Sequence, residues 1–118
     1  MLSENEFVVA SARVLDCIAA ALDEAIDDAD ADLDWSLNDG VLSIDCGPRG
    51  KLVVNRHVPN REIWIAAKSG GFHFHVEGTY WRDTRSGEEL AAALTRIMRE
   101  QASFDLKLPA LSALPAQR

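Results

Sequence analysis

The sequence predicts an α+β fold, a two-layer α/β sandwich in which two terminal helices pack on one face of a five- to six-stranded, mainly antiparallel sheet. Three observations lead to this prediction. Apolar residues recur with a helical period near both ends, they alternate with a period of two in between, and the strands follow one another too closely for crossover helices. Since both helices cover the same face, the other sheet face must meet solvent or a partner.

The first element is a helix over residues 4–28. Its apolar residues recur at spacings of three, four and seven and therefore form one stripe along the helix. They are Phe7, Val14, Ile18, Leu22 and Ala25. At about 100° per residue, Asp16, Asp23 and Asp27 fall within about 40° of one another on the opposite side. The helix is thus predicted to have an apolar side and an acidic side.

The middle of the chain is predicted to form five strands, or six if a short last one is included. They cover residues 33–37, 41–45, 51–56, 62–68, 72–77 and 80–82. In the first strand, Leu33, Trp35 and Leu37 alternate with polar residues, which is typical of a strand with one buried face. Asn38-Asp39-Gly40 is a hairpin signal, and glycines and prolines mark the later turns.

The second helix is expected to begin at Ser86, because Ser86 and Glu89 have the spacing of a capping box. Its apolar stripe consists of Leu90, Leu94, Ile97 and Met98. We expect a single domain over residues 1–105 and a C-terminal tail over residues 106–118. The segment from Phe104 onward contains two prolines, and it is expected either to pack irregularly on the domain or to be partly disordered.

Charge is unevenly distributed along the 118 residues, whose formal net charge is −7. Residues 1–48 contain twelve acids and one base, which gives −11, whereas residues 49–118 contain eleven bases and seven acids, which gives +4. The acidic half should repel nucleic acid and attract basic proteins or cations.

The location predicted from the sequence is the cytoplasm. Cys17 and Cys46 are too few for a disulfide framework and are typical of reduced thiols in a cytosolic protein. The N-terminal residues lack the pattern of a signal or transit peptide. The apolar runs are too short to span a membrane, so no membrane partner is expected.

The first candidate site is a run of eight carboxylates without a base, which we call the acidic ridge. It consists of Asp16, Asp23, Glu24, Asp27, Asp28, Asp30, Asp32 and Asp34. Carboxylates bind hard cations such as calcium, magnesium, manganese or iron, and a bound cation would relieve their mutual repulsion. The alternative is a merely solvated helix face. An EF-hand loop starting at Asp28 is excluded because Leu33 occupies the glycine position, so binding should be shallow and weak.

The second candidate site is the sheet face away from the helices, which we call the open sheet face. If the alternating apolar residues point inward, this face displays Asn55, Trp64, His73 and His75 as partner-binding residues. An exposed tryptophan is a frequent hot spot for binding, but a strand phase shifted by one residue would instead bury Trp64 in the core. His73 and His75 are alternate residues of one strand and therefore point to the same side. They are either two ligands of a transition metal or ordinary surface histidines.

No pattern in the sequence indicates catalysis, and we assign no catalytic residue. The chain lacks a G-x-S-x-G, an H-E-x-x-H and a glycine-rich phosphate loop. Exposed carboxylates on a helix also lack the burial that general acids need. We therefore expect a protein that is not an enzyme.

Taken together, these segments resemble the frataxin family, in particular its bacterial CyaY type. The resemblance extends over residues 6–98 and is carried mainly by two stretches. These are Asn55-Arg56-x-x-Pro59-x-x-x-x-Trp64-x-Ala66 and Lys68-x-Gly70-Gly71-Phe72-His73-Phe74. Gly40-Val41-Leu42 and Asp83-x-x-Ser86-Gly87 agree with it.

The resemblance implies a frataxin-like fold and a role in iron–sulfur cluster assembly. It implies weak binding of ferrous and ferric iron, matched by the family's acidic positions at Asp23, Glu24 and the later aspartates. It also implies binding and regulation of the cysteine desulfurase and its scaffold protein, with Asn55 and Trp64 matching exposed sheet residues that contact this machinery. Ala19 and Ala20 stand where bacterial relatives often carry acids, which moves the expected iron site to the end of the helix.

Three functions are therefore weighed. The first is an iron-binding accessory protein, monomeric without iron, that regulates the desulfurase–scaffold complex and donates iron. The second is a protein-interaction module whose ridge binds a basic partner without metal. The third, implied by eukaryotic relatives of the family, is an iron-storage oligomer with ferroxidase activity.

Overall fold

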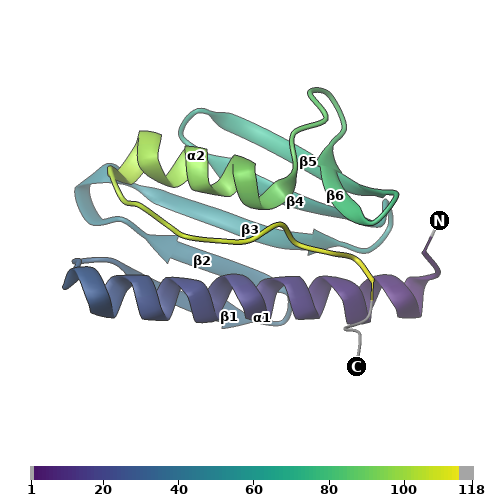
Figure 1. The fold of residues 1–118 in the computed structure, drawn as a ribbon, viewed down its shortest axis with the longest axis horizontal. Coiled ribbons are helices and arrows are strands. Elements are labelled where there is room, and N and C mark those ends of the chain that lie inside the picture. Colours follow the sequence, from purple (N-terminus) through teal and green to yellow (C-terminus); the bar gives the residue numbers. More distant parts are fainter. Residues whose placement is uncertain (1, 115–118) are drawn as a thin grey trace.

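The computed structural model describes residues 2–114, which form two helices and a six-stranded sheet (Figure 1). The elements are α1 (Glu4–Ala29), β1 (Asp34–Asn38), β2 (Val41–Asp45), the 3-10 turn η1 (Gly47–Arg49), β3 (Lys51–His57), β4 (Glu62–Ala67), β5 (Gly70–Glu77), β6 (Tyr80–Asp83) and α2 (Leu90–Ala102). Each strand pairs antiparallel with the next, so the sheet order follows the chain. Both helices cover one face of the sheet, which confirms the predicted two-layer α+β fold.

Helix α1 is stabilised at its start by a capping box that the sequence reading missed. The Glu6 N–H donates to Ser3 Oγ (3.1 Å), and the Ser3 N–H donates to Glu6 Oε1 (2.9 Å). The predicted apolar stripe is buried at Phe7, Ile18 and Leu22. The helix ends at Ala29, because Asp30 adopts a left-handed conformation with φ of 48°.

The strands alternate in the predicted phase. Their inward side chains form the core with the helices, and they include Leu42, Ile44, Leu52, Val54, Ile63, Ile65, Phe74 and Trp81. The Phe7 and Trp81 rings meet edge to face at 5.9 Å, which joins α1 to β6. Trp64 is only half-buried, so the alternative phase that would place it in the core is wrong.

Helix α2 begins four residues later than predicted, at Leu90. Gly87 takes a positive φ of 78°, and the buried Asp83 carboxylate accepts the Arg85 N–H at 2.7 Å, so the segment around Ser86 is a turn. Glu89 is the N-cap, and its carboxylate accepts the Ala91 and Ala92 N–H groups at 2.9 and 3.2 Å. The predicted capping box at Ser86 is therefore wrong: Glu89 caps the helix itself.

The C-terminal tail runs between the two helices (Figure 1). Phe104, Leu106, Leu111 and Ala113 are buried in the core. The Ala113 N–H donates to the Thr79 carbonyl at 2.7 Å and the Leu111 N–H donates to Glu89 Oε2 at 3.0 Å. The sequence allowed either a packed or a partly disordered tail, and up to Leu114 the tail is packed on the domain. The predicted tail also includes residues 115–118, which lie outside the described residues, and the domain boundary at 105 stays a prediction.

Candidate functional site

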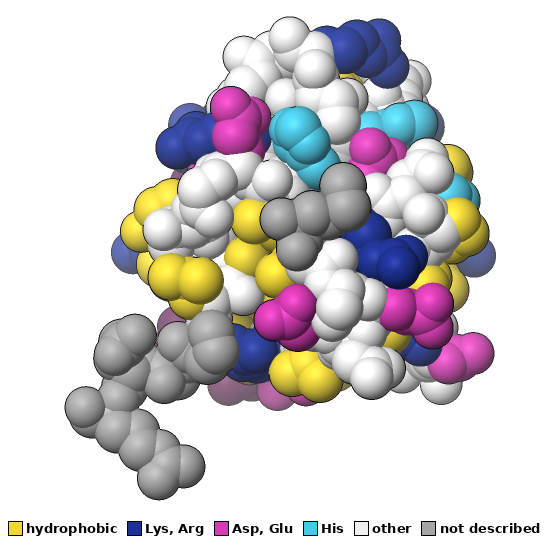
Figure 2. All heavy atoms as spheres, turned by 90° about the vertical axis from the view of Figure 1, so that its right-hand side faces the viewer, with side chains coloured by type: hydrophobic (Ala, Val, Ile, Leu, Met, Phe, Trp, Pro, Cys, Tyr) yellow, Lys and Arg dark blue, Asp and Glu magenta, His cyan; other side chains and the backbone are white. Residues whose placement is uncertain are grey.

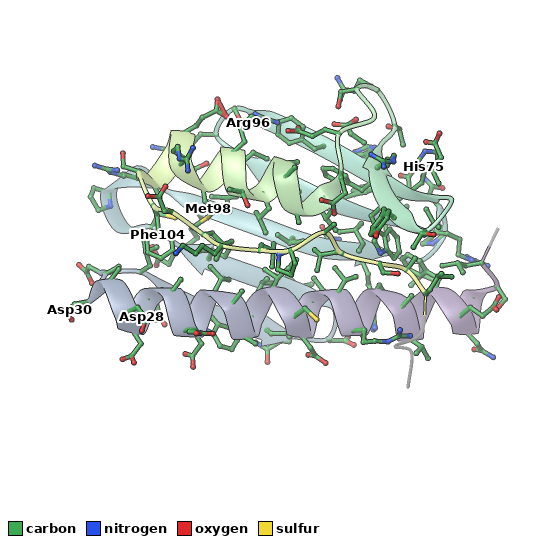
Figure 3. The ribbon with its side chains drawn as sticks, viewed as in Figure 1. Asp28, Asp30, His75, Arg96, Met98 and Phe104 are labelled. Atoms are coloured by element: carbon green, nitrogen blue, oxygen red, sulfur yellow. The ribbon has the colours of Figure 1, made fainter. Side chains whose placement is uncertain are left out.

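The acidic ridge lies along the solvent side of α1 and continues into the start of β1. All eight of its side chains are exposed. Five lie on α1, Asp30 is the C-terminal cap, Asp32 lies in the connection and Asp34 begins β1. Figure 3 shows Asp28 and Asp30 at the C-terminal end of α1, pointing away from the body of the protein. Of the two alanines that stand where bacterial relatives often carry acids, Ala19 is buried and only Ala20 lies on the exposed surface of α1.

The charge of the ridge is uncompensated. Four Arg–carboxylate ion pairs and two His–carboxylate contacts occur among residues 2–114, and none of them involves a ridge carboxylate. The last turn of α1 has no basic residue. The free carbonyls at a helix C-terminus carry partial negative charge, so Asp27, Asp28 and Asp30 add like charge where cations are favoured. A bound cation or a basic partner would relieve this repulsion.

The ridge does not form a preformed metal cage. Within the part of the chain that the structure describes, no three Asp, Glu, His or Cys side chains converge closely enough to hold a metal ion. The carboxylates are spread along a helix and a strand, which suits one or two protein ligands per ion with water completing the shell. His73 and His75 likewise find no third ligand among residues 2–114.

The open sheet face carries three stacked rings. Trp64 on β4 lies between His57 on β3 and His73 on β5, with ring centroids 3.8 and 4.3 Å apart and planes within 12° and 9° of parallel. Asn55 and His73 are the residues paired with Trp64 on the neighbouring strands. The face therefore brings three of the four predicted partner-binding residues side by side, while His75 lies farther along β5 near Glu77, with 3.4 Å between Nε2 and Oε2.

One carboxylate, that of Glu62, contacts two rings of this stack. Trp64 Nε1 donates to Glu62 Oε1 at 2.8 Å, and His73 Nδ1 lies 3.8 Å from the same oxygen. Sequence reasoning missed His57 because it ended the third strand at residue 56. The alternation of Val53 and Asn55 could have found it, since His57 is the next residue on the same side. Its partnership with Trp64 is diagonal, since His57 pairs with Glu62, and it follows only from the strand register.

Charges on the end of the molecule shown in Figure 2 are arranged differently from those of the ridge. Figure 2 views the right-hand side of Figure 1, and acidic and basic side chains are interspersed there, with histidines in the upper part. The excess of unpaired negative charge found on the ridge is therefore not shared by this end of the molecule. Neither helix within residues 2–114 has the length and apolarity that crossing a membrane requires.

Comparison with known proteins shows the family of this chain. The family model described as a frataxin-like domain matches residues 1–104. An iron-sulfur cluster assembly protein CyaY of Cupriavidus pinatubonensis is 45% identical over 107 residues, covering 91% of this chain and 96% of the relative. The CyaY of Paraburkholderia xenovorans is 43% identical and covers 86% of this chain and 92% of the relative.

Solved structures agree on the fold. A frataxin from Psychromonas ingrahamii superposes with a TM-score of 0.73 at 24% identity, covering 90% of this chain and 97% of that one. A trimeric frataxin from Saccharomyces cerevisiae, in a complex with ferrous, superposes with a TM-score of 0.70 at 28% identity, covering 80% of this chain and 86% of that one.

Proposed function

This chain belongs to the frataxin-like family, with the CyaY proteins of iron–sulfur cluster assembly as relatives, and we propose that it serves this assembly by binding iron and regulating the cysteine desulfurase. The observation that carries the proposal is the exposed, unpaired ridge at the C-terminal end of α1. In this role the protein is an accessory factor and not an enzyme, it acts in the cytoplasm, and it is monomeric without iron.

Iron binding is proposed at the carboxylates from Asp23 to Asp34. Carboxylate oxygens are hard ligands that suit ferrous and ferric iron, and the helix terminus adds attraction for a cation. Because no cage is preformed among the described residues, each ion keeps much of its water shell and binds weakly. Weakly held iron can be passed on, which is what a donor to a scaffold protein needs. Support from a relative is the yeast frataxin in a ferrous complex.

Two surfaces are proposed to contact the assembly machinery at once. The ridge would bind a basic surface of the cysteine desulfurase, since opposite charges steer and orient such an encounter. The open sheet face, with Asn55, Trp64 and His73, would contact the scaffold protein, and His75 would lie at the rim of this contact.

The iron part of the proposal is tested by titrating ferrous iron, without oxygen, into ¹⁵N-labelled protein. Amide signals from Asp23 to Asp34 should broaden selectively, and signals of β4 and β5 should not. The triple variant Asp27→Lys, Asp28→Lys and Asp30→Lys should lose this broadening. A matched variant reversing the off-ridge acids Asp39, Glu77 and Glu100 changes the net charge equally and should keep it. Unchanged ridge signals in the wild type would refute iron binding there.

The same two variants test desulfurase binding. The ridge reversal should abolish binding to a bacterial cysteine desulfurase, and the off-ridge reversal should weaken it far less. If ridge reversal abolishes binding and iron has no influence on the complex, the metal-independent interaction module is the better description. The scaffold contact predicts that Trp64→Ala weakens the ternary complex and spares binding to the desulfurase alone.

The iron-storage alternative is favoured only by the trimeric state of the yeast relative. It predicts that excess iron and oxygen convert the protein to oligomers with oxygen consumption. A mass that stays monomeric under these conditions, measured by light scattering after size exclusion, would exclude it.

A further inference from the structure

A groove runs along the side of α1 that faces the C-terminal tail. One part of it, near the C-terminal end of α1, has a volume of about 510 Å³ and lies between Ala20, Ala25 and Ala29 on one wall and Pro109 on the other. A second part of about 430 Å³ shares Ala20 and Pro109 with the first and continues to Arg13. Because they share lining residues, the two parts form one elongated groove, and residues 13–29 of a helix span about 24 Å.

The walls of this groove are mostly apolar and small. The α1 wall has alanine at positions 20, 21, 25 and 29, and the tail contributes Leu108, Pro109 and the half-exposed Leu114. Small side chains allow another backbone to approach closely, and an elongated apolar groove of this kind accommodates the apolar face of a helix. An apolar surface of this kind is suited to binding a protein segment and not to binding a cation.

The rim of the groove is acidic at one end. Glu24, Asp28 and Asp105 line the part near the C-terminal end of α1, together with Lys107. Asp105 is paired with Arg99 at 3.0 Å, whereas Glu24 and Asp28 form no ion pair within the described residues. At the opposite end of the groove stands Arg13, whose Nη1 donates to the Leu114 carbonyl at 2.9 Å. The groove therefore has a direction set by charge.

The five ridge carboxylates on α1 thus form two arrays. Glu24 and Asp28 lie one turn apart and both line the groove. Asp16, Asp23 and Asp27 lie on the other side of the exposed surface of α1 and do not line it. The first array can act together with the apolar wall, and the second cannot.

We propose that the groove between α1 and the C-terminal tail binds a basic amphipathic helix of a partner protein. Its apolar side chains would lie against the alanines of α1 and Leu108, and its Lys or Arg side chains would lie against Glu24 and Asp28. The α1 helix of a second copy does not fit as the occupant, because it would bring acid against acid. The identity of the partner rests on the proposed function, in which the desulfurase complex supplies this helix. The chemistry of binding in the groove does not depend on the proposed function.

The test uses two synthetic peptides of about 16 residues, the length of helix that the groove accommodates. One carries leucines along one helical face and lysines along the other, and the second has every leucine replaced by serine at the same charge. The leucine peptide should bind at least about tenfold more tightly and shift amide signals of residues 20–29 and 105–111. Equal affinities, or shifts confined to Asp16, Asp23 and Asp27, would overturn the proposal.

Matched variants distinguish the contribution of the apolar wall to peptide binding from that of the acidic rim. The double variant Ala20→Gln and Ala29→Gln leaves the charge unchanged and should weaken the leucine peptide about tenfold, whereas Ala92→Gln on an exposed part of α2 should not. Glu24→Gln with Asp28→Asn should weaken it more than Asp16→Asn with Asp23→Asn, which remove the same charge from the same helix. Equal effects within either pair would count against the groove. Circular dichroism checks that each variant folds.

Failure of the groove proposal can be distinguished from failure of the proposed function. If the peptide docks in the groove but the desulfurase does not bind the wild type, the proposed function fails and the groove stands. If the desulfurase binds and neither the Ala20/Ala29 variant nor competing leucine peptide weakens it, the groove is not its docking site and this inference is overturned.

Discussion

Replacing Glu89 by alanine should destabilise the protein more than the loss of an ordinary helix cap. Its carboxylate accepts the N–H groups of Ala91, Ala92 and Leu111 at 2.9, 3.2 and 3.0 Å, so it caps α2 and anchors the tail. Loss of an N-cap costs about 1 kcal/mol. Leaving the partly buried Leu111 N–H without an acceptor costs a further ~1–3 kcal/mol. We expect a loss of about 2–4 kcal/mol in the free energy of unfolding.

Urea unfolding followed by far-UV circular dichroism measures this loss. The comparison is Ser3→Ala, which removes the cap of α1 but leaves no buried tail group unpaired, and which should cost about 1 kcal/mol. Glu89→Gln keeps one carbonyl acceptor and should fall between the two. The midpoint should move and the slope should stay, because the unfolded state is unchanged. A Glu89→Ala loss no larger than that of Ser3→Ala would refute the double role of Glu89.

Two further predictions concern titratable side chains. Burial, with a smaller contribution from the Asp45 carboxylate, raises the pKa of the Cys46 thiol. At pH 8, iodoacetamide should therefore modify the exposed Cys17 first and Cys46 only after unfolding, and equal labelling by mass spectrometry would contradict this. Hydrogen bonds from Ser3 lower the pKa of Glu6, so its contribution to stability is present at neutral pH and lost as the pH falls below about 4. The difference in stability between the wild type and Glu6→Gln should shrink between pH 7 and pH 3, and a pH-independent difference would disprove it.

The open sheet face shows how far sequence reasoning reaches. Because side chains alternate along a strand, inward-pointing Ile63 and Ile65 predicted an outward Trp64, and their burial decides against the opposite phase. The parallel stack of Trp64 between His57 and His73 was not predicted, because it needs the pairing of three strands and one diagonal contact. The family resemblance identified Trp64 as a contact residue, but only the strand register shows which side chains surround it.

The second helix shows where local motifs mislead. Ser86 and Glu89 have capping-box spacing, yet the helix begins only after Glu89. The buried Asp83 and the positive φ of Gly87 form a turn there, and the Leu111 N–H bonds to the Glu89 carboxylate from 22 residues away. A local pattern could not show this competition, because the tail residue that contributes to it is distant in the chain.

The sequence by itself determined the amphipathic α1, the alternation of the strands and the run of acids from Asp16 to Asp34, because each depends on the fixed period of a single element. It therefore predicted the layers of the fold and the ridge. Only the tertiary structure decided that the tail packs between the helices and that Glu24 and Asp28 face it across an apolar groove, apart from the other acids. These features arise where segments some 80 residues apart along the chain meet, and such contacts leave no periodic pattern in either segment.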